Sequence, residues 1–442
     1  MNATRILLGM RGITIDRKQR IMKREPRIVI CLLLAICALI FIQPAQADMV
    51  TYWNDIATTN AKAVPAQVPV PQTRTYAMMH AAVHDALNAI DRRYQPYALR
   101  MQGQLDASPD AAVAAAAYGV LVHVLPAQKV FLDEVYYDQS LSSIPDGASK
   151  DAGIAIGQAA AATIIALRSS DGSDPLLPCP YSPGSGPGVW IPTDSRPAAI
   201  PCWGNVTPFS LRSGAQFRLD RPKFFDLTSK EYAANYNEVK EIGEVNYPSR
   251  SEDQRLIAKF WYEASAQGWN RITRIVSAKH PLDLWENARL FALVNFALAD
   301  GYIAHFDTKY LYNFWRPVTA IRAGDADGND ATRADTGWTS FLVAPNIPDY
   351  PSGHSTVGAA VAFVLAGFFG QDEVPFTTTS GAPFPDIIRS FASFSQAALE
   401  NADSRVFAGI HFRTSCRDGV RLGKEVGRFV FKNSLKPVHP IK

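Results

Sequence analysis

This sequence contains few cysteines, has a small net charge and lacks the alternating patterns that indicate strands. Only five of the 442 residues are cysteine, which excludes a small fold held together by many disulfides. The formal net charge is only +3, because Lys and Arg are almost balanced by Asp and Glu. No segment alternates convincingly between apolar and polar residues with the period of two that indicates a strand. With 47% hydrophobic residues, the chain nevertheless has ample material for a buried core.

The longest apolar run lies near the N-terminus and predicts a signal peptide. Basic residues at 23, 24 and 27 precede an apolar run over residues 28–42, and Ala45-Gln46-Ala47 is a small-x-small cleavage site. We expect cleavage of residues 1–47 before Asp48 and export to the periplasm or the exterior. The run is shorter than the ~20 residues of a spanning helix, so an uncleaved anchor is the weaker alternative. We therefore expect no stable membrane insertion after cleavage.

Removal of the leader reverses the sign of the net charge. Residues 1–47 contain eight Lys and Arg but only two Asp and Glu, which leaves the mature chain at −3. Such a chain lacks the excess of basic residues that a nucleic-acid partner requires. Three cysteines remain, Cys179, Cys202 and Cys416. Because an exported protein keeps disulfides and the first two share Pro-Cys contexts in one loop, we expect them to pair and Cys416 to stay free. Three unpaired buried cysteines are the alternative.

Helical periodicity dominates the mature chain and predicts an all-α fold. Residues 48–73 are proline-rich and are expected to be extended. Small-residue helices that pack closely favour a bundle in an N-terminal helical region, 48–168. A Pro/Gly-rich loop at 169–225 is long enough to cover a site or an oligomer contact, and a C-terminal helical region follows at 226–442. Helices are expected at 74–91, 109–124, 127–142, 149–168, 229–241, 251–265, 282–305, 353–370, 383–402 and 417–434.

Two patterns that superficially suggest metal sites are interpreted as structural. His80 and His84 lie four residues apart on one face of the helix expected at 74–91. No glutamate follows in the zinc-protease pattern and no third ligand is evident, so a structural role is favoured. Residues 325–330 resemble a calcium loop, but the glycine comes too early and no glutamate closes the loop. We expect a solvated turn there.

Three short motifs in the C-terminal half together contain the groups of an oxyanion pocket. Lys309 and Arg316 are seven residues apart among aromatic residues, and a continuing helix would point both cations the same way. The burial suggested by these neighbours requires a bound counter-charge. The second motif, Pro351-Ser352-Gly353-His354, precedes an apolar helix. A helix start with Ser and Gly binds anions through its unpaired N–H groups, and a histidine there is placed for acid–base chemistry.

The third motif is Ser404-Arg405-Val406-Phe407-Ala408-Gly409-Ile410-His411. Arg405 offers bidentate oxyanion binding, and a neutral imidazole nitrogen of His411 could bond to the central atom of the anion. One straight helix would not aim both side chains inward, because six residues do not complete whole turns. We expect Gly409 to provide the bend that turns His411 toward the site.

In this order, the three motifs resemble the signature of the vanadium-dependent haloperoxidase and type 2 phosphatidic acid phosphatase (PAP2) superfamily. The segments 74–91 and 282–317 also look like its bacterial haloperoxidase-like branch. The resemblance implies two packed four-helix-type bundles and a pocket for vanadate, or for phosphate in its place. It implies that His411 is the axial vanadium ligand and that His354 is the acid–base residue. The implied residues around the equatorial oxygens are Lys309, Arg316, Ser352, Gly353 and Arg405, with Lys309 also polarising bound peroxide.

The resemblance implies a haloperoxidase that oxidises halide with hydrogen peroxide to a hypohalite-type species, which halogenates a small organic acceptor. The alternatives are an acid phosphatase that hydrolyses phosphomonoesters through phospho-His411, and a non-enzymatic oxyanion-binding protein. A homo-oligomer is compatible with the sequence. Many relatives have Asp four residues after the second histidine, where this chain has Ser415, so the partner of His411 is open. Nearby carboxylates that could take this place are Asp300, Asp307 and Asp418.

Overall fold

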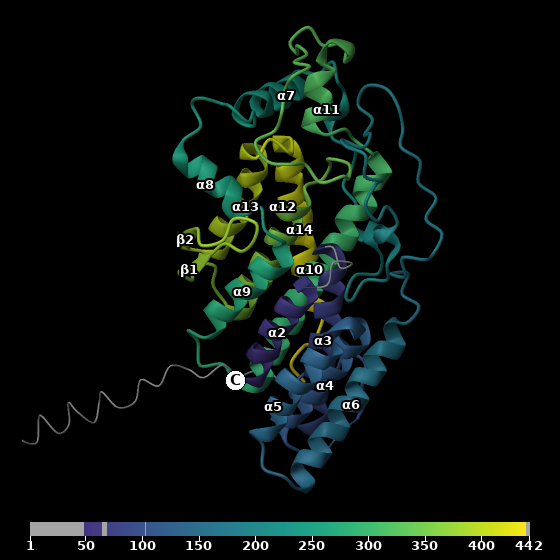
Figure 1. Cartoon of the computed structure of the whole chain (residues 1–442), viewed down its shortest axis with the longest axis vertical. Helices are drawn as coiled ribbons and strands as arrows, with labels where there is room; N and C mark the ends of the chain where they lie inside the picture. The colour runs from purple at the N-terminus through teal and green to yellow at the C-terminus, as the bar shows by residue number, and fades with distance from the viewer. Residues whose placement is uncertain (1–47, 64–68, 102, 439–442) are drawn as a thin grey trace, which may run out of the picture. The chain divides into compact units, whose positions relative to one another are not determined.

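The helices of this all-α protein form two groups that share one long central helix, α10 (Leu284–Tyr312) (Figure 1). The computed structural model describes residues 48–63, 69–101 and 103–438, so the predicted signal peptide lies outside the described residues. On one side of α10 lie α3 (Pro69–Ile90), α4 (Pro109–Val124) and α6 (Ala148–Arg168). On the other lie α12 (Gly353–Phe369), α13 (Phe394–Phe407) and α14 (Arg413–Asn433). This arrangement confirms the predicted fold class.

The sequence of α10 explains its central position. Asp283 and Glu286 form a capping box that satisfies backbone N–H groups at the start of the helix. Almost every residue from Asn287 to Lys309 is buried, on all sides of the helix. A helix that is apolar all round must be covered on every side, and here both helix groups cover it. Its last turn therefore delivers Lys309 into the interior of the protein.

The N-terminal segment corrects one prediction. The described parts of the segment 48–73 are not extended, because they form α2 (Met49–Ala63) and the first turn of α3. Pro69 and Pro71 lie in that first turn, where the missing proline N–H has no helical partner to lose. Val50 and Trp53 of α2 are fully buried, so the helix belongs to the core. The expected helix at 127–142 is also shorter, since it divides into η1 (Pro126–Gln128), the π-helical η2 (Phe131–Tyr137) and α5 (Asp138–Ser142).

The middle of the chain contains short elements and one helix that the sequence pattern missed. Most boundaries agree with the predictions, but 251–265 ends early as α8, and α9 was not predicted. The elements between the long loop and α12 are η3 (Trp203–Asn205), η4 (Gly214–Phe217), η5 (Lys223–Phe225), α7 (Lys230–Ile242), α8 (Glu252–Phe260), α9 (Ser265–Ser277), α11 (Pro317–Arg322) and η6 (Gly324–Ala326).

A short hairpin corrects the expectation of a helix from residue 383. Strands β1 (Phe376–Thr379) and β2 (Ile388–Phe391) pair antiparallel, with Phe376 opposite Phe391, and α13 begins only at Phe394. Each strand has four residues, too few for a period-two pattern to stand out in the sequence. Both phenylalanine side chains are buried against the helices, so the hairpin is anchored at one end.

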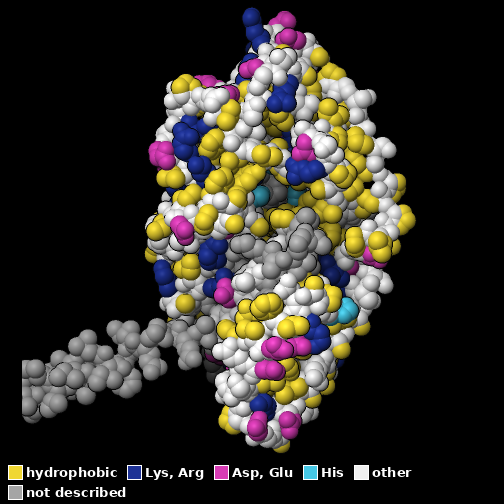
Figure 2. Space-filling view, in the orientation of Figure 1, with side chains coloured by type: hydrophobic (Ala, Val, Ile, Leu, Met, Phe, Trp, Pro, Cys, Tyr) yellow, Lys and Arg dark blue, Asp and Glu magenta, His cyan; other side chains and the backbone are white. Residues whose placement is uncertain are grey.

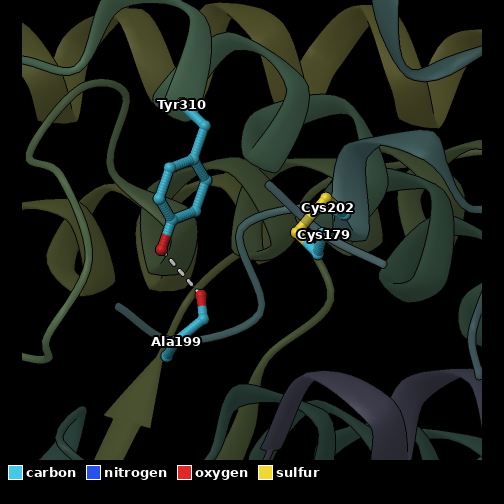
Figure 3. Close-up of a disulfide and its surroundings, with 4 residues drawn as sticks. All are labelled: Cys179, Ala199, Cys202 and Tyr310. Atoms are coloured by element: carbon cyan, nitrogen blue, oxygen red, sulfur yellow. Dashed lines mark hydrogen bonds between the residues drawn. A yellow bond between two sulfur atoms is a disulfide. The ribbon is translucent and has the colours of Figure 1, made fainter. Parts of the chain in front are cut away.

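The long Pro/Gly-rich loop contains the predicted disulfide. Cys179 and Cys202 are bonded, while Cys416 is free and buried (Figure 3). We call residues 179–202, which this bond closes, the strap. Figure 3 also shows the Tyr310 hydroxyl, in the last turn of α10, donating to the Ala199 carbonyl of the strap at 2.7 Å. The strap is therefore fastened to the end of the helix that carries Lys309.

Among the described residues, one helix is long and apolar enough to cross a membrane by length and composition alone. It is α6, of which a third of the relevant window is buried. Its buried positions include Gly153 and Gly157, where an added Cβ would meet the backbone of α4 at 2.4 Å. The close approach of two backbones packs α6 into the N-terminal helix group.

Candidate oxyanion site

Lys309 enters the site from the last turn of α10 and is fully buried. Its ammonium donates to three backbone carbonyls, those of Pro348 at 2.8 Å, Asp349 at 2.9 Å and Pro351 at 2.7 Å. Burial, followed by the neighbouring Arg316, holds the pKa of Lys309 well below its ordinary value. Lys309 thus fixes the segment that leads into the Ser-Gly-His motif, and its three N–H donors are all engaged there.

Arg316 reaches the site from beyond the end of α10, so one helix does not carry both cations as predicted. The helix ends at Tyr312 because Asn313 adopts the left-handed conformation, with φ 50° and ψ 40°. Arg316 then caps α11, with Pro317 in its first turn. Its guanidinium is fully buried and donates to the Ile347 and Ile410 carbonyls, at 2.8 and 2.7 Å. Lys309 and Arg316 are still neighbours in space, because the turn after α10 brings Arg316 back toward Lys309.

The start of α12 has the local geometry that the sequence analysis expected of an anion cradle. Ser352 is the N-cap, and its hydroxyl accepts from the Ser355 backbone N–H at 3.4 Å and the Ser355 hydroxyl at 2.8 Å. Gly353 occupies the first helical position, where backbone N–H groups have no partner inside the helix. A Cβ at Gly353 would come within 2.8 Å of His305 Nε2, so glycine is required by the close packing. Sequence reasoning did not single out His305, because it belongs to no motif.

His354 is half-buried in the first turn of α12. Its Nε2 lies 3.1 Å from the Glu263 carbonyl oxygen, in the segment between α8 and α9. Burial, followed by the positive charge of Arg405, holds the pKa of His354 well below its ordinary value. The ring is therefore neutral at pH 7 and is oriented by a backbone acceptor, with one nitrogen left for the site.

Gly409 makes the turn that the sequence predicts. Its φ is +75°, and an added Cβ would meet the Gly243 carbonyl oxygen at 2.2 Å, so no other residue fits. Helix α13 carries Arg405 and ends at Phe407, and α14 starts at Arg413. His411 lies in this corner and is only 3% exposed. The bend turns both Arg405 and His411 toward the same interior site.

His411 is the point at which the three motifs meet. Its Nε2 lies 3.0 Å from Arg316 Nη1, and its Nδ1 lies 2.9 Å from Asp349 Oδ1. Burial, followed by the charges of Arg316, Lys309 and Arg405, holds the pKa of His411 well below its ordinary value. His411 is therefore a neutral imidazole that contacts a guanidinium, which lies near both ring nitrogens, and a carboxylate, which lies near Nδ1.

The carboxylate beside His411 is Asp349, which the sequence analysis did not consider. Burial raises the pKa of Asp349 to about 6, and the nearby Arg316 opposes this rise. The three carboxylates that were considered lie elsewhere. Asp300 accepts the backbone N–H groups of residues 209–211, Asp307 pairs with Arg218, and Asp418 accepts the Tyr350 hydroxyl. Asp300 and Asp307 lie near Lys309 in sequence and Asp418 lies near His411, but all three carboxylates bind other partners.

Two buried donors of the site have no partner among the described residues. They are Arg316 Nη2 and Arg405 Nε, in guanidinium groups that are almost fully buried. Burial lowers the pKa of both arginines only to about 10, so both remain charged at pH 7. With Lys309, three buried cations lie around His411, and one buried carboxylate, that of Asp349, contacts the ring. Unpaired buried donors and excess positive charge are costly unless an anion completes them, which fits a bound oxyanion.

The two patterns interpreted as structural lie outside this cluster. His80 Nε2 lies 2.8 Å from the Asn54 side-chain amide, within the core between α2 and α3. His84 lies 3.2 Å from Asn88 Nδ2 in the same helix. In the 325–330 turn, Asp327 is buried and accepts the Thr332 hydroxyl at 2.8 Å, so the turn is braced internally as well as solvated. No group of three metal-ligating side chains occurs among the described residues.

A hollow opens on one face of the protein, and histidine side chains are visible inside it (Figure 2). Hydrophobic side chains gather around its rim in the same view. Hydrogen bonds place the strap beside the buried cations. The Ala199 N–H donates to the Asn346 carbonyl at 3.1 Å, one residue before the carbonyl that accepts from Arg316. The strap therefore supports the segment 346–351 that Lys309 and Arg316 hold.

Known proteins resemble this chain in sequence. Residues 289–440, which carry all three motifs, match the family model for the second helical-bundle domain of VCPO. The chain is 25% identical to vanadium chloroperoxidase of Curvularia inaequalis, over 83% of this chain and 79% of that protein. These likenesses support assignment of the chain to the vanadium-dependent haloperoxidase and PAP2 superfamily.

Solved structures of haloperoxidases have the same fold. A bacterial vanadium-dependent iodoperoxidase is similar with a TM-score of 0.76 and 24% identity, over 90% of this chain and all of the other. The holo form of a bacterial vanadium-dependent chloroperoxidase gives a TM-score of 0.71 and 20% identity, over 89% and 98% of the two chains. These haloperoxidases span almost the same length as the present chain, so the fold likeness includes the N-terminal helix group.

Proposed function

We propose that this protein is a vanadate-dependent haloperoxidase that uses hydrogen peroxide to oxidise halide to a hypohalite-type species, which halogenates a small organic acceptor. The observation that carries the proposal is the cluster of Lys309, Arg316 and Arg405 around a neutral His411. Two donors in this cluster lack partners within the part of the chain that the structure describes. Membership of the superfamily supports a haloperoxidase-type activity. The leader further supports export, which would place the enzyme in the periplasm or outside the cell.

The residues present fit vanadate. Arg316 and Arg405 would hold its oxygens through their unpaired donors, and Ser352 and the Gly353 N–H would do so at the start of α12. The unprotonated nitrogen of His411 would bind vanadium. Bound vanadate would supply Lewis-acid activation of hydrogen peroxide. Lys309 would either add its charge from a distance or exchange one of its three carbonyl partners for an oxygen of the anion.

His354 is placed for proton transfer at the rim of this pocket. Its ring is neutral, and the Glu263 carbonyl holds one nitrogen, so the other can accept a proton from peroxide. The strap and the hydrophobic rim would limit the entry of water, which strengthens the electrostatic interactions inside. Positioning and fixed charge thus come from this chain.

A phosphatase acting through phospho-His411 is the second candidate. The contact between Asp349 and His411 favours it, because a carboxylate on one ring nitrogen makes the other a better nucleophile. The same cations would neutralise the phosphoryl oxygens.

One set of assays separates the candidates. Mature protein stripped by chelation is assayed with bromide, iodide or chloride plus peroxide, with and without vanadate, and with p-nitrophenyl phosphate alone. Vanadate-dependent halogenation supports the proposal. Phosphate release with trapping of phospho-His411 supports the phosphatase and overturns the haloperoxidase. Tight vanadate binding without either turnover identifies an oxyanion-binding protein.

A further inference from the structure

We propose that Asp349, held by Ser415, is the positioning residue that fixes the ring orientation and tautomer of His411. This inference deepens the proposed function, because it concerns the same pocket. Asp349 Oδ1 lies 2.9 Å from His411 Nδ1, close enough for an ion-pair contact, and no hydrogen bond within the described residues occupies this buried oxygen. An ionised carboxylate only accepts hydrogen bonds, so Nδ1 must carry the ring proton. The lone pair is then on Nε2.

The position of Arg316 is compatible with this tautomer. Arg316 Nη1 lies 3.0 Å from His411 Nε2 and 3.4 Å from Nδ1, and a guanidinium only donates hydrogen bonds. The shorter contact is to Nε2, so an acceptor at Nε2 suits Arg316, while the assignment of the proton to Nδ1 rests on Asp349. The nitrogen with the lone pair is the one that faces the buried cations, where an oxyanion would lie. An Nε2-protonated ring would present an N–H there and could not bond to the central atom.

Four contacts hold Asp349 in place, two through its backbone and two through its carboxylate. Its N–H donates to the Phe314 carbonyl at 2.9 Å, and its carbonyl accepts from Lys309 at 2.9 Å. The Ser415 hydroxyl donates to Oδ2, and the Phe412 N–H also donates to the carboxylate. Asp349 is thus fixed by the segments on both sides of the site, and its own surroundings leave Oδ1 for His411.

Ser415 explains how this chain differs from relatives with a carboxylate at that position. Its carbonyl accepts the Ser352 N–H at 2.9 Å, and its hydroxyl holds Asp349. The carboxylate that such relatives carry at the start of the last helix is supplied here from the segment before Ser352. Ser415 links the two places. Asp349 would not touch the oxyanion, so it acts through the imidazole.

The test measures the tautomer directly. Uniformly 15N-labelled histidine is read by NMR at pH 7.5, with the His411 signals assigned by their loss in His411→Gln. We expect a protonated Nδ1 and a bare Nε2 in the wild type. Asp349→Ala should convert His411 to a mixture of tautomers. Asp349→Asn should keep the Nδ1 proton, because the amide oxygen still accepts.

Phosphate affinity, measured by calorimetry, gives a second readout that needs no turnover. Loss of an orienting partner of a ligand histidine typically costs about 10–100-fold in affinity, which we expect for Asp349→Ala. Ser415→Ala should cost less. The double variant Asp349→Ala/Ser415→Asp places a carboxylate at position 415 instead. It should recover much of the lost phosphate affinity and restore the Nδ1 tautomer.

The matched control is Asp300→Asn, which changes another fully buried carboxylate that only binds backbone N–H groups. It should lower stability without altering the His411 signals. An unchanged tautomer and an unchanged phosphate affinity in folded Asp349→Ala would overturn the inference. If Asp349→Ala does not fold, an Nε2-protonated His411 in the wild type would overturn it equally. A protein with the Nδ1 tautomer but no halogenation would refute the proposed function alone.

Discussion

His80 and His411 are both buried histidines, 0% and 3% exposed, yet they lie in different electrostatic surroundings. His80 lies 2.8 Å from the side-chain amide of Asn54, which begins a chain of amide hydrogen bonds to Asn270 at 2.7 Å and from Asn270 to Asn295 at 2.9 Å. The nearby cation Arg274 is paired with Asp55 at the surface. His411 instead lies near three buried cations, two of which, Arg316 and Arg405, have an unpaired donor within the described residues. A buried histidine in a hydrogen-bonded network therefore does not mark a site, whereas uncompensated buried charge does.

Removal of each histidine should give the largest contrast. His411→Ala is expected to abolish vanadate-dependent halogenation, because the nitrogen that binds the central atom is lost. His80→Gln should leave the rate per folded molecule within about twofold while lowering stability, since a change in the core away from the site acts mainly on folding. Steady-state rates, normalised to folded protein by circular dichroism, test the pair. A full rate in His411→Ala would contradict the site assignment.

Removal of an arginine from each cluster should give the next largest contrast. Arg405→Ala deletes a buried charged donor at the anion and is expected to reduce kcat by about 10²–10³-fold. Arg274→Ala is the matched control, because it removes a half-buried arginine beside His80. Its kcat should stay near that of the wild type. The comparison fails if both variants lose activity equally.

Loss of the disulfide in the strap should lower the stability of the protein and also weaken anion binding at the site. Cys179 and Cys202 are 23 residues apart, and removing such a cross-link as Cys179→Ser/Cys202→Ser should cost about 3 kcal/mol in the free energy of unfolding. Because the strap is bonded to Asn346, weaker phosphate binding should accompany this loss. Urea denaturation and calorimetry measure the two effects. The control Cys416→Ala removes a free cysteine and should leave the strap intact.

The pH dependence of stability should show the smallest difference. Burial lowers the pKa of His80 from 6.5 to about 3. Between pH 6.5 and 3, His80 is protonated in the unfolded chain but neutral in the folded protein. The free energy of unfolding therefore decreases as the pH falls through this range. Relative to His80→Gln, the wild type should lose stability more steeply in this window, by at most about 1.4 kcal/mol per pH unit. Equal slopes in urea titrations would contradict this pKa.

The sequence predicted most long helices, and it selected candidate site residues that the structure brings close together. Lys309, Arg316, Ser352, Gly353, Arg405 and His411 all lie in one buried cluster, with His354 at its edge. The turn at Gly409 was also predicted, since glycine between two inward-facing side chains indicates a bend. By contrast, α2 and α9 were missed. Proline near the start of a helix suggests a helix breaker in a sequence, although the first turn tolerates it.

The partner of His411 shows why the rest could not be predicted. Asp349 lies 62 positions before His411 and outside every motif, so nothing in the linear pattern joins them. The candidates chosen for their closeness in sequence point to other partners, because neighbouring residues on a helix face different directions. The role of Ser415 could not be predicted either, because its hydroxyl donates to Asp349, which belongs to a distant segment of the chain.

By itself, the sequence determined the helical class, the disulfide pair and the set of side chains that can bind an oxyanion. These follow from local periodicity, from cysteine context and from the chemistry of residue types. Only the tertiary structure decided that α10 ends at Asn313, before Arg316. It also decided that Lys309 donates to three backbone carbonyls and that Asp349 lies beside His411. Each of these depends on distances between segments far apart in the chain, which packing of the two helix groups around α10 sets.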